Sequence, residues 1–293
     1  MANERRVLVT GANKGIGLAI VQAILEHAED TLVVLGSRDE ERGRDAASAV
    51  ASTRPEWAPR IEVLSIDVAR SESVSAAAAD LERRGLTLYG LVNNAAIGVG
   101  SGTLAAILET NTRGVIRTTE AFLPLLDPSR GRIVNVSSGA APMFVSTCSP
   151  ERQRDFVDGS ITRARFEEIL AECSSLGDDA AAFTARGLGD GSAYGLSKAL
   201  VNVYTMIVAR EHPLLRVNAC TPGFIATDLT QPYVASSGKT PAELGMKPPS
   251  EGAKAPMHLL FVELEGNGRY YGSDAKRSPL DRYRSPGSPE YTG

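Results

Sequence analysis

Short apolar runs alternate with longer amphipathic segments along the chain, and this alternation predicts an α/β fold. The apolar runs are rich in Val, Ile and Leu, as in strands buried on both faces of a sheet. Helical segments separate them, so successive strands are expected to lie parallel with right-handed crossovers. The pattern predicts one doubly wound parallel sheet in a single domain, residues 1–293. The predicted strands are 7–10, 31–36, 61–66, 88–92, 132–136, 214–219 and 269–271.

A glycine-rich loop follows the first predicted strand and precedes a helical pattern of apolar residues. Glycines allow a tight turn and a close approach of the backbone to a pyrophosphate, and a helix N-terminus offers unpaired N–H groups. In the order strand, loop, helix, such a loop predicts a dinucleotide site and a Rossmann-type sheet. The loop residues assigned to the cofactor are Gly11, Asn13, Lys14, Gly15, Ile16 and Gly17.

The end of the second predicted strand indicates which dinucleotide is bound. This position faces the adenosine ribose in βαβ units, and its first charged residue is Arg38. A guanidinium suits a ribose 2′-phosphate, and Lys14 adds a second cation, so we expect NADPH rather than NADH. The alternative is that Asp39 binds the ribose hydroxyls and Arg38 is only solvated.

Polar residues also follow the next two strands, at the sheet edge where ligands bind in open α/β folds. Asp67, followed by Val68, is placed to accept from an adenine amino group, with a helix cap as the structural alternative. Asn94 is placed to brace the backbone beside the ligand. We assign all three residues to the cofactor site.

Two further polar positions belong to the same edge. Asn111 is expected to begin a helix running to about residue 126, and a plain N-cap is its structural alternative. Ser137 and Ser138 follow the fifth strand, where a hydroxyl can reach a bound ligand.

Tyr194 and Lys198 form a candidate acid/base pair in a segment predicted to be helical. Residues four apart lie on the same face of a helix. A free phenol has a pKa near ~10, and a positive charge within roughly 4–6 Å lowers it. A tuned phenol can donate or accept a proton. The alternative is a surface lysine beside a half-buried tyrosine.

Three segments depart from the strand–helix alternation. The segment of about residues 142–191 is too long for an ordinary loop and has too few apolar residues to form a separate core, so we interpret it as an insertion. Residues of about 224–249 are expected to form a substrate lid. The tail of about 276–293 is expected to wrap the surface or to be partly disordered.

Composition excludes several classes of function. The chain has 293 residues, 43% hydrophobic and 23% charged, with a net charge of −4, so no electrostatic argument favours a nucleic acid or a membrane surface. Three cysteines and three dispersed histidines fit neither a disulfide framework nor a metal site. Residues 1–6 lack the features of a signal peptide, and no apolar run is long enough to span a bilayer, so we expect a cytoplasmic protein.

Six motifs in order resemble the short-chain dehydrogenase/reductase superfamily over about residues 6–275. The long insertion resembles the carbonyl reductase branch, which implies NADPH dependence and a monomer, because the insertion covers a helix surface that dimerises elsewhere in the family. One departure is Ala96, where the family usually has Gly. The motifs are Thr10-Gly11 with Gly15-Ile16-Gly17, Asn93-Asn94-Ala95, Asn111, Ser138, Tyr194 with Lys198, and Pro222-Gly223.

The resemblance implies a role for each catalytic residue. Tyr194 donates the proton to the carbonyl oxygen, and Lys198 lowers its pKa and binds the nicotinamide ribose. Ser138, rather than Ser137, donates a hydrogen bond to the substrate carbonyl, and Asn111 holds a water in the proton relay. The remaining cofactor residues lie after the sixth strand, where Thr227 and the backbone at Ile225 hold the carboxamide. They are Pro222, Gly223, Ile225 and Thr227.

These observations predict NADPH-dependent reduction of a ketone, aldehyde or quinone to the alcohol. One alternative is a specialised reductase or dehydrogenase of a secondary metabolite, such as a terpenoid or alkaloid ketone. Another is a nucleotide-binding regulatory protein without catalysis, which the presence of Tyr194, Lys198, Ser138 and Asn111 disfavours.

Overall fold

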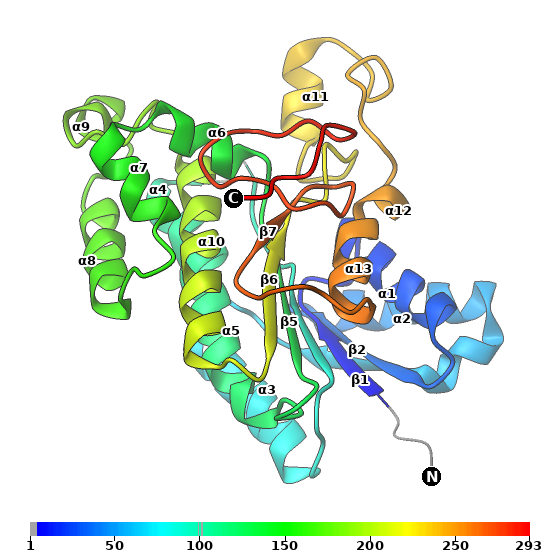
Figure 1. Ribbon diagram of the computed structural model, residues 1–293. Helices are drawn as coiled ribbons and strands as arrows, with labels where there is room; N and C mark the ends of the chain where they lie inside the picture. Colours follow the sequence, from blue (N-terminus) through cyan, green and yellow to red (C-terminus); the bar gives the residue numbers. More distant parts are fainter. Residues whose placement is uncertain (1–4, 99, 101) are drawn as a thin grey trace.

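Seven parallel strands form one sheet at the centre of the computed structural model, which describes residues 5–98, 100 and 102–293 (Figure 1). Their order is β3-β2-β1-β4-β5-β6-β7, so the chain reverses direction across the sheet between β1 and β4. This confirms the predicted doubly wound parallel sheet. The strands are β1 (Arg5–Val9), β2 (Thr31–Ser37), β3 (Ile61–Ser65), β4 (Gly90–Asn93), β5 (Arg132–Val136), β6 (Arg216–Cys220) and β7 (Tyr270–Tyr271).

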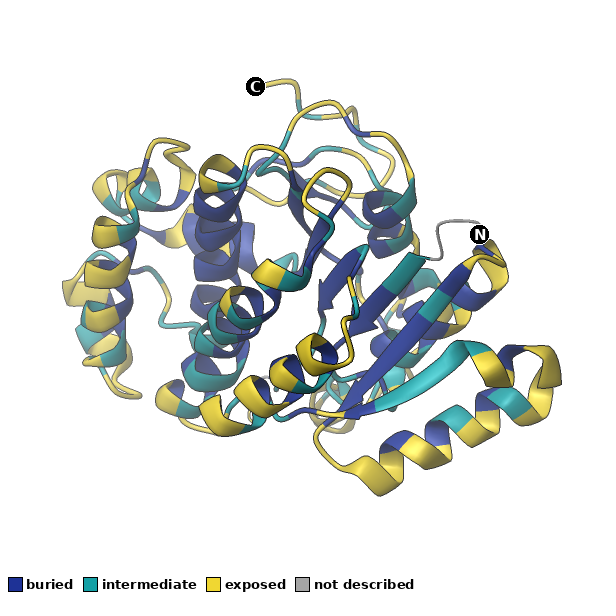
Figure 2. Cartoon of the chain, turned by 90° about the horizontal axis from the view of Figure 1, so that it is seen from below, coloured by how far each residue is buried: buried dark blue, intermediate teal, exposed yellow. Residues whose placement is uncertain are grey.

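Helices cover both faces of the sheet, because the central strands are apolar on both sides. One face packs against α1 (Gly15–His27), α2 (Glu40–Thr53) and α13 (Lys254–Phe261). The other packs against α3 (Ser71–Arg83), α4 (Leu104–Leu108), α5 (Gly114–Phe122) and α10 (Ala193–Glu211). Figure 2 shows the buried strands between helices whose outer faces are exposed.

Several predicted boundaries were wrong. Asn111 does not begin a helix, because the helix already begins at Leu104, where the Thr103 hydroxyl accepts from the Ala106 N–H at 3.3 Å. Asn111 lies instead in a π-helical turn, η2 (Glu109–Arg113), between α4 and α5. A 3₁₀ helix, η1 (Pro55–Arg60), precedes β3, and another, η3 (Leu123–Leu125), follows α5. Two helices, α12 (Pro249–Gly252) and α13, follow the lid segment.

The insertion consists of helices that pack on α10 rather than on a core of their own. They are α6 (Ala140–Thr147), α7 (Pro150–Val157), α8 (Arg163–Ser174) and α9 (Ala180–Ala185). Phe156, Phe166 and Phe183 are buried in the same apolar cluster as the inner side of α10. Phe166 lies 5.9 Å from Tyr204 of α10, measured between ring centres. The insertion is therefore a continuation of the main core.

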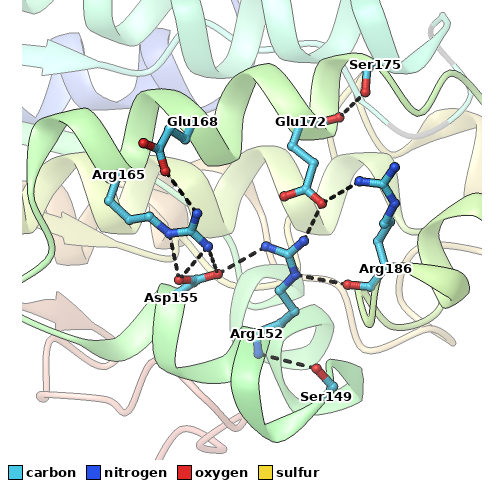
Figure 3. Close-up of polar contacts among 8 residues, drawn as sticks. All are labelled: Ser149, Arg152, Asp155, Arg165, Glu168, Glu172, Ser175 and Arg186. Atoms are coloured by element: carbon cyan, nitrogen blue, oxygen red, sulfur yellow. Dashed lines mark hydrogen bonds and ion pairs between the residues drawn. The ribbon is translucent and has the colours of Figure 1, made fainter.

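An ion-pair network ties the insertion helices to one another (Figure 3). Arg152 of α7 pairs with Asp155 at 3.2 Å and with Glu172 of α8, and its Nε donates to the Arg186 carbonyl at 3.0 Å. Arg165 of α8 pairs with Asp155 at 3.0 Å. The Arg152 side chain is 14% exposed, so these contacts are largely shielded from water.

The expected lid and tail both follow β6. The lid segment carries α11 (Gln231–Ser237), which projects from the body of the molecule (Figure 1). The tail has neither helix nor strand after β7, yet Ser278 and its neighbour Pro279 are buried. Among the described residues, no helix combines the length and apolar character that crossing a membrane requires. The first four of the six residues used for the signal-peptide prediction lie outside the described part.

Candidate active site

The glycine loop is shaped by close contacts that only glycine permits. Gly11 and Gly15 have φ angles of +61° and +58°, in the left-handed region. A Cβ on Gly17 would lie 2.5 Å from the Asn94 side-chain nitrogen, so no larger residue fits there. Asn94 Nδ2 donates to the carbonyls of Thr10 at 2.9 Å and Gly11 at 3.2 Å. The bracing role predicted for Asn94 is therefore directed at the glycine loop itself.

Thr10 is a positioning residue that the sequence reasoning left out of the site. Its hydroxyl accepts from the backbone N–H groups of Asn94 at 3.0 Å and Ala95 at 3.1 Å. It thereby joins the ends of β1 and β4, where the direction of the sheet order reverses. A hydroxyl directly after a buried strand and before a glycine loop was the signal that could have identified it.

The start of α1 is suited to an anion. Gly15 is its first residue, Lys14 precedes it, and the first turn has neither a side-chain cap from the described residues nor an acidic side chain. Its first N–H groups and the positive end of the helix dipole therefore face the loop. Ile16 and Ile225 both lie against Gly252 of α12, which closes this side of the loop. The loop fits the diphosphate of a dinucleotide.

The residues after β2 favour one of the two ribose alternatives. Asp39 caps α2 by accepting from the Arg42 N–H at 3.1 Å, and its other oxygen pairs with the Arg42 guanidinium at 3.3 Å. Arg38 is exposed and has no partner among the described residues. A carboxylate engaged by a helix terminus and an arginine is a poor ribose ligand, whereas the free guanidinium of Arg38 suits a phosphate.

Lys14, the second cation assigned to the phosphate, is paired with a carboxylate. Its ammonium pairs with Asp228 at 2.6 Å, which joins the glycine loop to the loop after β6. Both side chains are well exposed, so this pair is worth less than about 1 kcal/mol and can exchange for a phosphate.

Asp67 and Val68 lie just past β3 in different surroundings. One oxygen of Asp67 accepts from the Ala69 N–H at 3.1 Å in a local turn, so Asp67 is not the cap of α3, which Arg70 precedes. Val68 is buried, and a Cβ on Gly114 of α5 would lie 3.1 Å from it. The second oxygen of Asp67 has no partner within the described ranges.

The two serines after β5 point in different directions. The Ser137 hydroxyl is buried and donates to the Lys198 carbonyl at 3.2 Å, so it holds α10 against the sheet. Ser138 is only half-buried, and its hydroxyl interacts with the Tyr194 phenol. This difference supports Ser138 over Ser137 as the residue facing a substrate.

Tyr194 is positioned by the start of α10. The Ser192 hydroxyl caps this helix by accepting from the Gly195 N–H at 3.1 Å. Gly195 allows α10 to pack closely on α6, because a Cβ there would lie 2.7 Å from Phe144. Burial raises the pKa of Tyr194, and the interaction with Ser138 lowers it by less. The net direction is opposite to the lowering expected from Lys198.

Lys198 is buried beside the end of β5. Its ammonium donates to the Val136 carbonyl at 2.9 Å and lies 5.9 Å from the centre of the Tyr194 ring. Burial lowers the pKa of Lys198 from 10.5 to about 8. The predicted spacing therefore brings the two side chains to the same place, with the lysine close to neutral at mildly alkaline pH.

Asn111 is fully buried in the π turn and faces α10. Its Oδ1 accepts from the Ile97 N–H at 2.9 Å, and its Nδ2 donates to the Ile97 carbonyl at 3.0 Å and to the Ser197 hydroxyl at 3.2 Å. Such turns inside α-helices often occur at functional sites. The turn thus holds Asn111 against Ser197, the residue that precedes Lys198 on α10.

The loop after β6 approaches the glycine loop from the other side. Pro222 leads into Gly223, which has a φ of +95° and donates to the Thr221 hydroxyl at 3.2 Å. Thr227 lies against Gly15, since a Cβ there would be 3.4 Å from its methyl group. A cavity of about 220 Å³ lies beside Thr227 within the lid segment. Its lining is Ala226, Thr227, Asp228, Thr230, Gln231, Val234 and Pro241.

Two more residues missed by the sequence reasoning hold Ser138 and its neighbour in place. The Thr221 hydroxyl accepts from the Gly139 N–H at 3.0 Å, and the Tyr270 phenol donates to the Ser138 carbonyl at 3.0 Å. Asn13, by contrast, is half-buried and makes no side-chain hydrogen bond among the described residues. No group of His, Cys, Asp or Glu in the described part of the chain could hold a metal ion.

The chain is similar to known proteins over most of its length. The family model for the short chain dehydrogenase matches residues 5–150. Carbonyl reductase [NADPH] 1 of Rattus norvegicus is 35% identical, covering 90% of this chain and 98% of the relative.

Two solved structures extend the similarity to the fold. Menthone neomenthol reductase from Mentha piperita is 27% identical with a TM-score of 0.70, over 93% of this chain and 99% of that one. An NADPH-bound carbonyl reductase from chicken fatty liver is 26% identical with a TM-score of 0.63, over 94% of each. The chain therefore belongs to the short-chain dehydrogenase/reductase superfamily and is similar to its carbonyl reductases.

Proposed function

We propose that this protein reduces a ketone, aldehyde or quinone to the alcohol, with NADPH as the reductant and Tyr194 as the proton donor. The observation that carries the proposal is the meeting of Ser138, Tyr194 and Lys198 at the end of β5. The carboxyl ends of β1, β4 and β5 also hold the glycine loop and Asn94, in the crevice where open α/β sheets bind ligands.

Ser138 and Tyr194 act on the carbonyl oxygen. The Ser138 hydroxyl donates a hydrogen bond to this oxygen, which stabilises the negative charge that develops there. Tyr194 then delivers its phenolic proton to the same oxygen. The raised pKa of Tyr194 supports this assignment, because the half-buried phenol keeps its proton until the developing alkoxide takes it.

Lys198 and Asn111 support the proton transfer. Lys198 binds the hydroxyls of the nicotinamide ribose and favours the phenolate formed on Tyr194. Asn111 holds a water in a relay that returns a proton to Tyr194 through Lys198. The burial of both residues, and the hydrogen bond from Asn111 to Ser197, which precedes Lys198 on α10, support the relay.

NADPH fits the residues that surround the glycine loop. When bound, it supplies a hydride to the carbonyl carbon and becomes NADP⁺. The N-terminus of α1 holds the diphosphate, and Arg38 with Lys14 holds the 2′-phosphate. Asp67 and Val68 contact the adenine, while Ile225 and Thr227 hold the carboxamide. The similarity to the rat and chicken proteins, both NADPH carbonyl reductases, supports this choice of cofactor.

A monomer in the cytoplasm is part of the proposal. Helices α7 and α8 pack along α10, and Phe166 covers Tyr204 on it. A second copy cannot use the same surface of α10 for a dimer. Gel filtration with light scattering tests this point, and a stable dimer of the full chain would contradict it.

A second candidate is a reductase of a specialised terpenoid or alkaloid ketone. The similarity to a menthone neomenthol reductase supports it, as do the exposed aromatic side chains of Phe224 and Tyr233 in the lid segment. The two rings lie 5.8 Å apart in an edge-to-face arrangement. Turnover confined to one bulky alicyclic ketone would favour this narrower function over a broad carbonyl reductase.

NADPH consumption against a panel of ketones, aldehydes and quinones tests the proposal. Tyr194→Phe should lower turnover about 10²–10⁴-fold while leaving NADPH affinity nearly unchanged. Tyr204→Phe is the matched control, because Tyr204 lies on the same helix and its hydroxyl donates to Glu120 at 2.9 Å, away from the site. Full turnover by Tyr194→Phe would refute the proton donor. Tight NADPH binding without any turnover by the wild type would instead favour the regulatory alternative.

A further inference from the structure

The tail after β7 returns to the substrate side of the sheet instead of leaving the molecule. Gly272 N–H donates to the Lys276 carbonyl at 2.8 Å, and Ala275 between them has a φ of +59°, so the chain reverses there. The Ser278 N–H then donates to the Tyr270 carbonyl at 2.8 Å. Figure 1 shows the tail, in red, beside α6 and above β7.

A buried arginine fixes the next part of the tail. The Arg284 side chain is 7% exposed and pairs with Asp274, while its Nε donates to the Ser278 hydroxyl at 3.0 Å and its Nη1 to the Ser288 carbonyl at 2.8 Å. Asp274 also accepts from the Gly287 N–H at 3.0 Å. Residues 274–288 are thus held around the Arg284 guanidinium, and we call this set of contacts the Arg284 clasp.

The clasp places Tyr283 against the backbone beside Ser138. A Cβ on Gly139 would lie 2.9 Å from Tyr283 Cε2 and 3.3 Å from its Cδ2, so the ring covers this glycine closely. The ring is still 45% exposed. One side of the phenol therefore packs on the residue that follows Ser138, and the rest is open to a ligand.

Tyr283 and Tyr194 both interact electrostatically with Tyr270. Burial raises the pKa of Tyr270, and smaller contributions in the same direction come from Cys220, Tyr283 and Tyr194. Both phenols therefore lie within electrostatic range of Tyr270, whose hydroxyl holds the Ser138 carbonyl. This agrees with the packing of Tyr283 on Gly139.

Other exposed apolar side chains lie on the segments that leave this edge of the sheet. Met143 is the fourth residue of α6, which begins directly after Gly139, and Phe224 directly follows Gly223. These exposed side chains favour an apolar ligand at this edge of the sheet. A planar ring such as that of Tyr283 favours aromatic groups, which stack on it in offset or edge-to-face arrangements.

We propose that Tyr283 forms a wall of the substrate site and selects carbonyl compounds with an aromatic substituent, and that the Arg284 clasp positions it. This inference rests on the proposed function. Tyr283 contacts the substituent rather than the reacting carbonyl, so it acts on substrate choice and leaves proton transfer unchanged. Arg284 is a positioning residue, since it acts only through Tyr283.

The test compares menadione, an aromatic quinone, with 2,3-butanedione, a small aliphatic diketone. In Tyr283→Ala, kcat/KM for menadione should fall about tenfold, mainly through KM, whereas the values for butanedione and the KM for NADPH stay unchanged. Tyr283→Phe keeps the ring and should keep the preference. Arg284→Met should reduce the preference in the same direction, although Tyr283 is still present. Unfolding temperatures of all variants are measured alongside.

The outcomes separate this inference from the proposed function. Turnover by the wild type with an unchanged menadione-to-butanedione ratio in Tyr283→Ala overturns the role of Tyr283. An equal loss for both substrates also overturns it, because that result indicates a structural role. A preference retained in Arg284→Met overturns the role of the clasp. Absence of wild-type turnover on the whole panel overturns the proposed function and, with it, this assignment.

Discussion

Asn111 Nδ2 donates to the Ser197 hydroxyl at 3.2 Å, and this hydroxyl donates in turn to the Tyr194 carbonyl at 2.8 Å. A buried amide from the helix layer before β5 thus holds the first turn of α10, on which Tyr194 and Lys198 lie. The same amide holds both backbone groups of Ile97. The catalytic helix is positioned by a contact between segments 86 residues apart in the sequence.

Asn111→Ala should destabilise the protein and reduce turnover together. It leaves the half-buried N–H and carbonyl of Ile97 without a partner, which costs about 2–6 kcal/mol at about 1–3 kcal/mol for each unsatisfied group. Urea unfolding and NADPH consumption measure the two effects. Ser197→Ala is the matched control, because it removes one partner of Asn111 and leaves Ile97 satisfied. A loss in Ser197→Ala as large as that in Asn111→Ala would contradict the importance of the Ile97 contacts.

Arg38→Asp should change the cofactor preference. The exposed guanidinium is replaced by a charge that repels the 2′-phosphate, so the KM for NADPH should rise about 10–100-fold, as expected for loss of a charge-assisted contact. The KM for NADH should change little. Arg44→Asp is the control, because it makes the same charge change on the outer side of α2, away from β2. Among the described residues, Arg44 pairs only with Glu40. Equal effects on the two cofactors would show that the ribose phosphate lies elsewhere.

The rate of carbonyl reduction should fall with rising pH as the Lys198 ammonium loses its proton. Burial lowers the pKa of Lys198 to about 8, so the ammonium that favours the Tyr194 phenolate is present below this pH and lost above it. We expect kcat/KM to be level near pH 6–7 and to fall as the pH rises through about 8. Initial rates at constant ionic strength test this expectation, and a level profile to pH 10 would contradict it.

Protein stability should show the same titration with the opposite sign. Between pH 8 and 10.5 the unfolded chain still binds the Lys198 proton that the folded chain has released, so the free energy of unfolding rises with pH in this range. Lys198→Met should remove that rise. Urea unfolding of wild type and variant across the range measures the difference, and parallel pH profiles would exclude Lys198 as the titrating group.

Arg152→Met should weaken the insertion without affecting the reaction. Its largely shielded guanidinium links Asp155, Glu172 and the Arg186 carbonyl, so we expect a loss of about 1–3 kcal/mol. Arg165→Met is the control, because Arg165 is 43% exposed and its ion pairs are worth less than about 1 kcal/mol. Calorimetry and NADPH consumption give the two readouts. Equal losses of stability would contradict the central position of Arg152.

The Glu172 carboxylate adds a pH dependence to this network. Burial raises its pKa, but hydrogen bonds from Arg152 and Arg186 lower it by more, so the net pKa lies below 4.5. The stabilisation that the ionised Glu172 gives the folded protein is complete above pH 4.5. It is lost as the pH falls through the lower pKa that Glu172 has in the folded state. Glu172→Gln should make the acid limb of the stability profile shallower.

The parts of the site that the sequence determined are those whose chemistry is local. The glycine loop is predictable because its seven residues include the glycines that adopt positive φ angles and the start of a helix. The Tyr194–Lys198 pair is predictable because residues four apart share one face of a helix. The parallel sheet followed from apolar runs separated by helical segments, because strands buried on both faces need no polar alternation. These features depend on neighbours in the chain, so the pattern of residues predicts them.

Only the tertiary structure decided the features that depend on distant partners. The π turn at Asn111 exists because Ile97 and Ser197 meet the same amide, so the predicted start of a helix there was wrong. Burial, which no local pattern measures, raises the pKa of Tyr194 against the lowering that its lysine neighbour suggested. Tyr283 packs on Gly139, next to Ser138, and its neighbour Arg284 pairs with Asp274, nine residues before Tyr283. Hydrogen bonds and desolvation depend on which segments pack together, and the sequence pattern does not specify that for a tail without helix or strand.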